Sequence, residues 1–212
     1  QTPLPLMPWP SSVQMGTGQL PIEVAFTVAL TGNKDPRLQR AADRFLENLR
    51  RKTGMVPLDL MKTNATTATL TVNAEKASKE IPELGEDESY SLEVSPSGAK
   101  IDAPTALGAM HGLQTFLQLV ENSPTGFVVP AVTIHDKPRF PWRGLLIDVS
   151  RHFMPLDVLK RNLDGMEAVK LNTVHLHLSD YQGFRVESKK FPKLQEMGSD
   201  GFYYTQAEIK DL

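Results

Sequence analysis

The sequence predicts an α+β domain followed by the first βα units of a (β/α)8 TIM barrel, which is incomplete in this chain. Three observations predict this fold class. Residues 12–135 alternate short apolar runs with two amphipathic segments, residues 144–179 follow the order strand, helix, strand, and prolines at 138 and 141 separate the two regions. We expect an extended amino-terminal arm (1–11), a small α+β domain (12–135) and the start of a barrel (136–212).

Composition narrows the class of protein. With 212 residues, 40% of them hydrophobic, the chain is long enough to bury a core. A net charge of −2 and the absence of a large Lys/Arg cluster argue against a nucleic-acid partner. No apolar run approaches the roughly 20 residues needed to cross a bilayer, so we expect no membrane partner. The lack of cysteine excludes disulfides and thiolate catalysis.

The amino-terminal residues suggest where the protein acts. They read QTPLPLMPWPSS, which is rich in proline and lacks an initiator Met. Such a start is expected where a signal peptide has been removed, and an arbitrary boundary of the sequence gives the same start. We expect a secreted or periplasmic protein.

Two segments of the α+β domain have the spacing of amphipathic helices. In residues 36–51 charged residues separate apolar positions that recur at three- and four-residue steps, and Gly54 is a fitting helix stop. Residues 107–120 repeat the pattern. The apolar positions are Leu38, Ala41, Ala42, Phe45 and Leu49 in the first helix and Leu107, Met110, Leu113, Leu117 and Val120 in the second.

Short apolar runs around these helices predict strands. The sequence Ser-Pro-Ser-Gly at 95–98 joins two of the runs and predicts a hairpin turn. Several strands with two helices among them are typical of an α+β sandwich. The expected strands cover residues 24–30, 69–72, 90–94, 99–101 and 127–134.

The second region predicts a parallel βαβ unit. Residues 144–150 and 173–179 are apolar runs, and residues 156–169 between them have helical spacing. In such units the loops at the carboxyl ends of the strands surround the ligand. Those ends carry Ser150-Arg151-His152 and Ser179-Asp180-Tyr181. Arg151 and Asp180 are therefore the candidate site residues.

This region is too short for a complete barrel. It holds about 72 residues, whereas an eight-stranded βα barrel typically needs roughly 250. Two strands alone would expose apolar faces and unpaired edges. We therefore expect the remainder of the barrel to come from further chain or from a separate chain.

The same region resembles the start of a family 20 glycoside hydrolase, a β-N-acetylhexosaminidase. The motifs that carry the resemblance are WRG at 142–144, LIDVSRHF at 146–153, KLN at 170–172, HLHLSD at 175–180 and QGFR at 182–185. The preceding α+β region is similar, more loosely, to the small non-catalytic domain that family members carry before the barrel. The resemblance covers nearly the whole chain.

The resemblance implies roles for both candidates. Arg151 would bind the 3- and 4-hydroxyls of a terminal N-acetylhexosamine, and Asp180 would accompany it. The chemistry fits, because a planar guanidinium spans two vicinal hydroxyls while a carboxylate fixes the guanidinium and accepts a hydroxyl hydrogen. The alternative is a salt bridge between Arg151 and Asp180 that only closes the top of the barrel.

Other polar residues of the region receive structural interpretations. His175 and His177 share one strand face, but no obvious third ligand completes a metal site, so we expect no metal and no cofactor. Both histidines are interpreted as hydrogen-bonded interior residues, and Asp148 as structural. Tyr181 stands where many family members have a second acid, so the resemblance implies the class of substrate and no finer assignment; the preference between gluco and galacto sugars would depend on residues of the absent strands.

The catalytic pair of the family is absent from this sequence. Family members share an Asp-Glu pair on a later strand, and this chain has only Glu86-Asp87-Glu88 in a loop of the first domain. The family's exception to the two-carboxylate scheme is substrate assistance, in which the sugar acetamide attacks its own anomeric carbon. We therefore expect an exo-acting β-N-acetylhexosaminidase in which this chain supplies part of the sugar pocket and by itself is inactive.

Two other functions are alternatives to the β-N-acetylhexosaminidase. One is a non-catalytic carbohydrate-binding or assembly fragment that keeps the front part of the family fold. The other is an unrelated doubly wound enzyme, which ranks last because no Gly-rich phosphate loop follows either strand.

Overall fold

The computed structural model describes residues 4–55, 65–181 and 183–212. The chain divides into two compact units, Gln1–Pro141 and Trp142–Leu212. The sequence placed the boundary in the segment 135–142 and assigned residues from 136 to the second domain; the last strand of the first unit ends at Asp136, and the units divide within this segment. Residues 4–11 of the expected arm form no helix or strand, and Leu4 and Leu6 pack against the core of the first unit.

The first unit is built on a seven-stranded mixed sheet. Its strand order is β1-β7-β4-β5-β3-β2, with β6 paired to β7. The pairs β2–β3 and β3–β5 are parallel, and the remaining pairs are antiparallel. The strands are β1 (Ser12–Pro21), β2 (Val28–Gly32), β3 (Leu70–Lys76), β4 (Tyr90–Ser95), β5 (Gly98–Thr105), β6 (Glu121–Ser123) and β7 (Gly126–Asp136).

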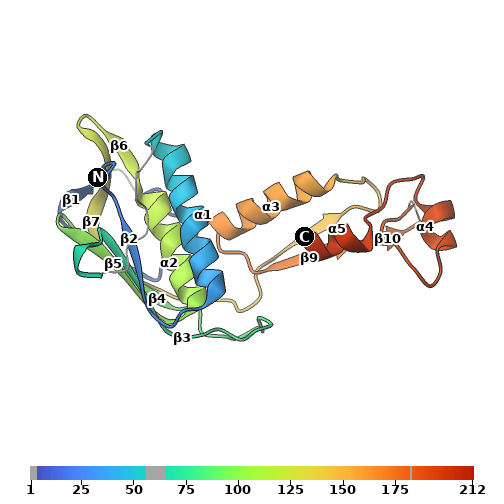
Figure 1. The fold of residues 1–212 in the computed structure, drawn as a ribbon, viewed down its shortest axis with the longest axis horizontal. Coiled ribbons are helices and arrows are strands. Elements are labelled where there is room, and N and C mark those ends of the chain that lie inside the picture. Colours follow the sequence, from blue (N-terminus) through green and yellow to red (C-terminus); the bar gives the residue numbers. More distant parts are fainter. Residues whose placement is uncertain (1–3, 56–64, 182) are drawn as a thin grey trace. The chain divides into compact units, whose positions relative to one another are not determined.

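Two helices lie side by side over one face of this sheet (Figure 1). They are α1 (Pro36–Thr53) and α2 (Ala106–Leu119), and a single 3-10 turn, Ala65–Thr67, precedes β3. The Asp35 side chain accepts the Arg37 N–H and begins α1, and Gly54 ends it with a left-handed φ of 71°. The rings of Phe26, Phe45 and Phe116 meet in the core with centroids 5.8–6.4 Å apart.

The element predictions for this unit are confirmed for the first helix and for the 95–98 hairpin, which joins β4 to β5. The first expected strand is displaced. Residues 24–27 are not strand, because the Phe26 N–H donates to the Glu23 carbonyl in a turn, and β2 begins at Val28. Strands β1 and β6 were not expected.

The buried face of α2 differs from the predicted one. Leu113 and Val120 are buried as predicted, whereas Leu107, Met110 and Leu117 are only partly buried. The positions closest to the sheet are small, since a Cβ at Gly108 would lie 2.0 Å from the Ser89 carbonyl oxygen. A search for large apolar residues at helical spacing therefore misses the close helix–sheet contact, which glycine and alanine make.

The second unit confirms the order strand, helix, strand. β8 (Gly144–Asp148) and β9 (Thr173–His177) are parallel, and α3 (Leu156–Ala168) connects them. After β9 the chain forms elements that were not expected: the short hairpin β10 (Ser179–Asp180) with β11 (Gly183–Phe184), and the helices α4 (Lys193–Gly198) and α5 (Gln206–Asp211).

Alternation along β8 and β9 gives the two-stranded sheet two different faces. One face packs with α3 around Ile147, Val149, Leu159 and Tyr204. On the other face Leu146 is 57% exposed and pairs with the exposed His175. None of the helices in the described ranges combines the length and the apolar character that a membrane span requires.

Candidate functional site

The carboxyl ends of β8 and β9 bring the two candidate residues together. Asp148 and His177 are register partners at the ends of the parallel strands. Arg151 and Asp180 each follow their strand end by three residues, so both lie at this edge. The Arg151 Nη2 lies 2.8 Å from the Asp180 Oδ2. The side chains are 50% and 30% exposed, so the pair is open to solvent.

Asp148 is a third member of this site, which the sequence interpretation as a structural residue did not include. Its Oδ2 lies 2.7 Å from the Arg151 Nη1, and its Oδ1 accepts the N–H groups of Ser150 and Arg151 at 3.1 Å. Two carboxylates therefore hold one guanidinium. The available signal was the position of Asp148, since it is an acid at the last residue of an apolar strand.

His177 extends the cluster at Asp180. Its Nε2 lies 2.8 Å from the Asp180 Oδ2, the oxygen that also contacts Arg151. Within the part of the chain that the structure describes, no group of three His, Asp or Glu residues is arranged to hold a metal ion. In the cluster the imidazole is a partner of the carboxylate.

The electrostatics of the cluster follow from these contacts. The hydrogen bond from the Arg151 side chain holds the pKa of Asp148 below its usual value. The Tyr181 N–H and then the His177 side chain lower the pKa of Asp180. Both carboxylates are therefore ionised at neutral pH, and with one guanidinium the three groups sum to a charge of about −1. Such a site favours a neutral polar ligand over an anion.

The guanidinium keeps donors for such a ligand. Arginine has five N–H donors, and contacts of Nη1 with Asp148 and Nη2 with Asp180 leave others to reach vicinal hydroxyls. The oxygens of Asp148 and Asp180 accept hydroxyl hydrogens in return. A sugar ring with two adjacent hydroxyls matches this set of donors and acceptors.

Tyr181 and its neighbours lie at the edge of the site. The Tyr181 side chain is 95% exposed, and its N–H donates to the Asp180 Oδ1 at 2.7 Å. Gln182 of the QGFR motif lies outside the described residues, while Gly183 and Phe184 form β11. The aromatic side chain is therefore presented to solvent directly beside the acid.

The only acidic run that resembles a catalytic pair lies elsewhere. Glu88 belongs to the first unit, is 9% exposed, and lies 2.6 Å from the His111 Nε2 through its Oε2. Asp87 caps its own turn by accepting from the Ser89 N–H and hydroxyl. Both carboxylates have partners within the first unit.

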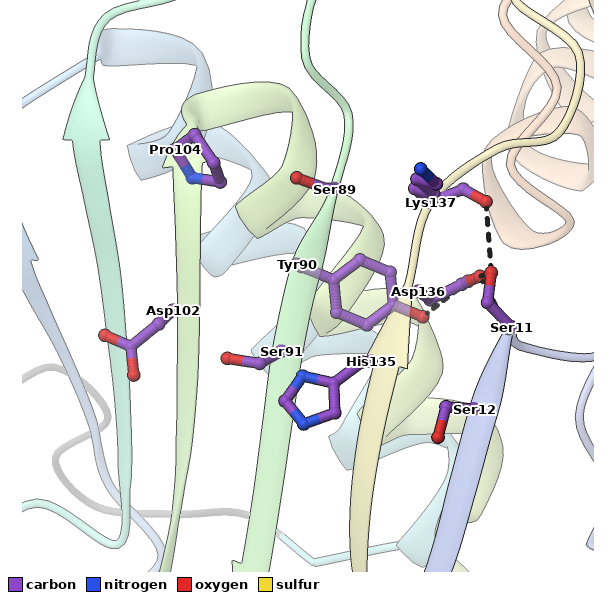
Figure 2. Close-up of a pocket in the computed structure, with 10 residues that line it drawn as sticks. All are labelled: Ser11, Ser12, Ser89, Tyr90, Ser91, Asp102, Pro104, His135, Asp136 and Lys137. Carbon is purple, nitrogen blue, oxygen red and sulfur yellow. Dashed lines mark hydrogen bonds between the residues drawn. The ribbon is translucent and has the colours of Figure 1, made fainter.

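The first unit has a hollow of its own, lined mainly by residues with polar side chains, on the face of the sheet away from the helices (Figure 2). The volume is about 400 Å³. A row of register partners crosses it: Ser12, His135, Ser91 and Asp102. A sheet with antiparallel strands commonly packs one face on the core and exposes the other face to water. This row of polar residues lies on the exposed face and needs no ligand to explain it.

Comparison with known proteins places both units. Residues 140–212 match the family model described as glycosyl hydrolase family 20, catalytic domain, and residues 6–119 match the model described as beta-acetyl hexosaminidase like. The chain is 39% identical over 168 residues to a β-hexosaminidase subunit beta of Entamoeba histolytica, an alignment that covers 74% of this chain and 30% of the relative.

Solved structures agree with the sequence matches. A chitobiase of Flavobacterium johnsoniae superposes with a TM-score of 0.93 at 47% identity, over 98% of this chain and 32% of that chain. A mutant Streptomyces plicatus β-hexosaminidase, solved in complex with product (GlcNAc), gives 0.82 at 32% identity, over 99% of this chain and 43% of that chain. The chain belongs to glycoside hydrolase family 20 and spans about a third of the length of these relatives.

Proposed function

We propose that this chain is the amino-terminal part of an exo-acting β-N-acetylhexosaminidase. Its substrates would be glycans that end in N-acetylglucosamine or N-acetylgalactosamine. The observation that carries the proposal is the pair formed by Arg151 and Asp180, 2.8 Å apart at the carboxyl ends of adjacent parallel strands. The similarity to β-hexosaminidases over both units supports it.

In this proposal Arg151 binds the 3- and 4-hydroxyls of the terminal sugar. Asp148 and Asp180 hold the guanidinium from two sides, so its remaining N–H groups point in a fixed direction. The net negative charge of the cluster suits an uncharged sugar. The Asp180 carboxylate accepts hydrogen bonds from the same hydroxyls, so the site both donates to the sugar and accepts from it.

β8 and β9 would be the first two strands of a (β/α)8 barrel. Leu146 and His175 on the face opposite α3 would then point to the barrel interior, where further strands cover them. A complete barrel needs roughly 250 residues, far more than the second unit contains. The relatives are about three times as long as this chain, which supports further strands in the complete protein.

The chemical step would be retaining and substrate-assisted. The acetamide oxygen of the bound sugar forms a bond to the anomeric carbon, which closes a five-membered ring, while the bond to the leaving oxygen breaks and a carboxylic acid gives that oxygen its proton. Water then gives a proton to the resulting carboxylate and attacks the anomeric carbon, which breaks the bond to the acetamide oxygen and opens the five-membered ring. In the family an Asp orients the acetamide and a Glu is the acid. This chain lacks that pair, so residues 1–212 alone would bind sugar weakly and would not hydrolyse it.

The test is hydrolysis by the complete protein encoded by the gene that contains this sequence. We expect it to release 4-nitrophenol from 4-nitrophenyl N-acetyl-β-D-glucosaminide, and we expect NMR to show the β-anomer as the first sugar product. Residues 1–212 alone are the control and should release none. A complete protein that binds chitobiose without cleaving either substrate would instead favour the non-catalytic carbohydrate-binding function.

Arg151→Lys tests the site. An ammonium cannot contact two carboxylates and two hydroxyls as a planar guanidinium does, so KM should rise by about 10- to 100-fold in the complete protein. The matched control is Arg161→Lys on α3, whose exposed side chain pairs with Asp157. An unchanged KM in Arg151→Lys, with activity intact, would remove the role given to Arg151.

Export is part of the proposal as well. A secreted or periplasmic enzyme would meet glycans outside the cell. Fractionation of the source cells should place the activity in the medium or periplasm, and a purely cytosolic activity would contradict this.

A further inference from the structure

Arg185 is a buried charged residue beside the candidate site. The residue is 6% exposed. Its Nε and Nη2 donate to the Ser150 carbonyl at 3.2 and 2.9 Å, and its Nη1 donates to the carbonyls of Ser199 and Phe202 at 2.6 and 3.1 Å. One guanidinium thus ties the end of β8 to the segment that follows α4. We call this arrangement the carbonyl clamp.

The backbone of Arg185 is fixed as well. Its N–H donates to the Leu178 carbonyl at 2.8 Å, and its own carbonyl accepts the Tyr204 N–H at 2.9 Å. The guanidinium therefore extends from a position held between the end of β9 and the α5 side of the unit. Because both the backbone and the guanidinium of Arg185 are held by hydrogen bonds, the side chain fixes the position of the Ser150 carbonyl relative to β9 and α5.

Ser150 is the residue through which the clamp reaches the site. It is fully buried, its hydroxyl donates to the Gly183 carbonyl at 2.9 Å, and its N–H donates to the Asp148 Oδ1 at 3.1 Å. Its carbonyl belongs to the peptide bond that leads into Arg151. The position of that carbonyl decides the direction in which the Arg151 backbone leaves the strand.

Gly183 leaves the space that the clamp requires. A Cβ at this position would lie 2.4 Å from the Arg185 Cζ and 2.5 Å from its Nε. The guanidinium is thus packed directly on the backbone of β11. Any side chain at position 183 would displace it from the Ser150 carbonyl.

We propose that Arg185 is a positioning residue of the sugar site, which orients Arg151 through the Ser150 carbonyl. This inference rests on the proposed function, because it assigns Arg185 to the binding of the terminal sugar. The role requires arginine, since a single ammonium nitrogen cannot reach the Ser150 carbonyl and the two carbonyls on the other side together.

The experiment is a double-mutant cycle in the complete protein, with 4-nitrophenyl N-acetyl-β-D-glucosaminide as substrate. We expect Arg185→Lys to raise KM by about tenfold, because a small misplacement of a binding group weakens the bound state. If Arg185 acts through Arg151, the double variant Arg151→Lys/Arg185→Lys should have a KM within about twofold of that of Arg151→Lys alone.

A structural role would give a different result. Tyr204→Phe is the matched control, because the Tyr204 hydroxyl donates to the Met154 carbonyl in the same core but does not reach Ser150. We expect it to lower the melting temperature and leave KM unchanged. An Arg185→Lys variant that behaves like this control, or whose effect on KM multiplies with that of Arg151→Lys, would overturn the inference.

Gly183→Ala covers the case in which Arg185→Lys does not fold. It keeps the guanidinium and displaces it, so KM should again rise by about tenfold. A folded Gly183→Ala protein with a wild-type KM would overturn the inference. The two proposals fail differently: a wild-type protein that does not hydrolyse the substrate overturns the proposed function, whereas an active wild type with neutral clamp variants overturns the clamp alone.

Discussion

Asp35 stabilises the first unit through several contacts. Its carboxylate caps α1 by accepting the Arg37 N–H at 2.8 Å, and it lies 2.8 Å from the Arg37 Nη2. Arg37 in turn donates to the carbonyls of Ser78 and Lys79. One acid thus ties the start of a helix to the segment that follows β3.

Asp35→Ala should therefore cost about 2 kcal/mol in the free energy of unfolding, from loss of the cap and of a charged hydrogen bond. Urea denaturation measures this cost. Asp43→Ala on the exposed side of α1 is the control and should stay within about 0.5 kcal/mol of wild type. Equal effects of the two substitutions would contradict the buried role of Asp35.

The stabilisation by Asp35 should depend on pH. The Arg37 hydrogen bond lowers the pKa of Asp35 below its usual value of 3.8. A carboxyl whose pKa is lower in the folded state stabilises the fold above its unfolded pKa and loses that effect as pH falls through the folded pKa. The stability difference between wild type and Asp35→Asn should be full at pH 6 and shrink below about pH 4. A pH-independent difference would contradict the assignment.

At the scale of elements, the packing of α2 gives a paired prediction on glycine. At Gly108 a Cβ would meet the Ser89 backbone, so Gly108→Ala should destabilise the protein by about 1–3 kcal/mol despite the better helix propensity of alanine. Gly165 in α3 has no atom within 4 Å of such a Cβ, so Gly165→Ala should stabilise by up to about 1 kcal/mol. Thermal unfolding of the two variants measures both effects. A change of stability in the same direction for both substitutions would contradict the packing described for Gly108.

The elements also separate what the sequence predicts from what it does not. The helix α1 was predictable because periodicity and the Gly54 stop agree. Strand β1 was not, because it is a mostly exposed edge strand containing Gly16 and Gly18, and its pairing with β7 shifts register between Met15 and Gln19. Such a strand forms because it pairs with a strand far along the chain, and its own sequence pattern does not show that pairing.

The candidate site divides in the same way. Arg151 and Asp180 were predictable because charged residues directly after apolar strands mark the carboxyl edge of a sheet. Asp148 and Arg185 were not placed in it, because their partners include main-chain groups at 150 and 199 that only the folded chain brings near. Sequence patterns show side chains and do not show which peptide groups will surround them.

For the whole molecule, the two units have separate cores, and the second leaves one face of β8 and β9 uncovered. Leu146→Asp tests whether this face is covered by further barrel strands in the complete protein. In a complete barrel the aspartate would move a carboxylate from water into the interior in place of an apolar side chain, which should cost several kcal/mol and lower the melting temperature strongly.

In residues 1–212 alone the same substitution should have little effect, because Leu146 is 57% exposed there. Ile81→Asp, at a loop position that is 78% exposed, is the control and should be tolerated in both proteins. Tolerance of Leu146→Asp in the complete protein would argue against the barrel.

The carbonyl clamp has one consequence for sequence variation. The acceptors that Arg185 reaches are peptide oxygens, which every amino acid supplies. Phe202 is 57% exposed and its ring lies 5.7 Å from that of Phe153, so a change of its side chain alters this ring contact while its carbonyl stays in place. Homologous sequences can therefore differ at position 202, and adjust position 153 with it, without losing an acceptor of the clamp.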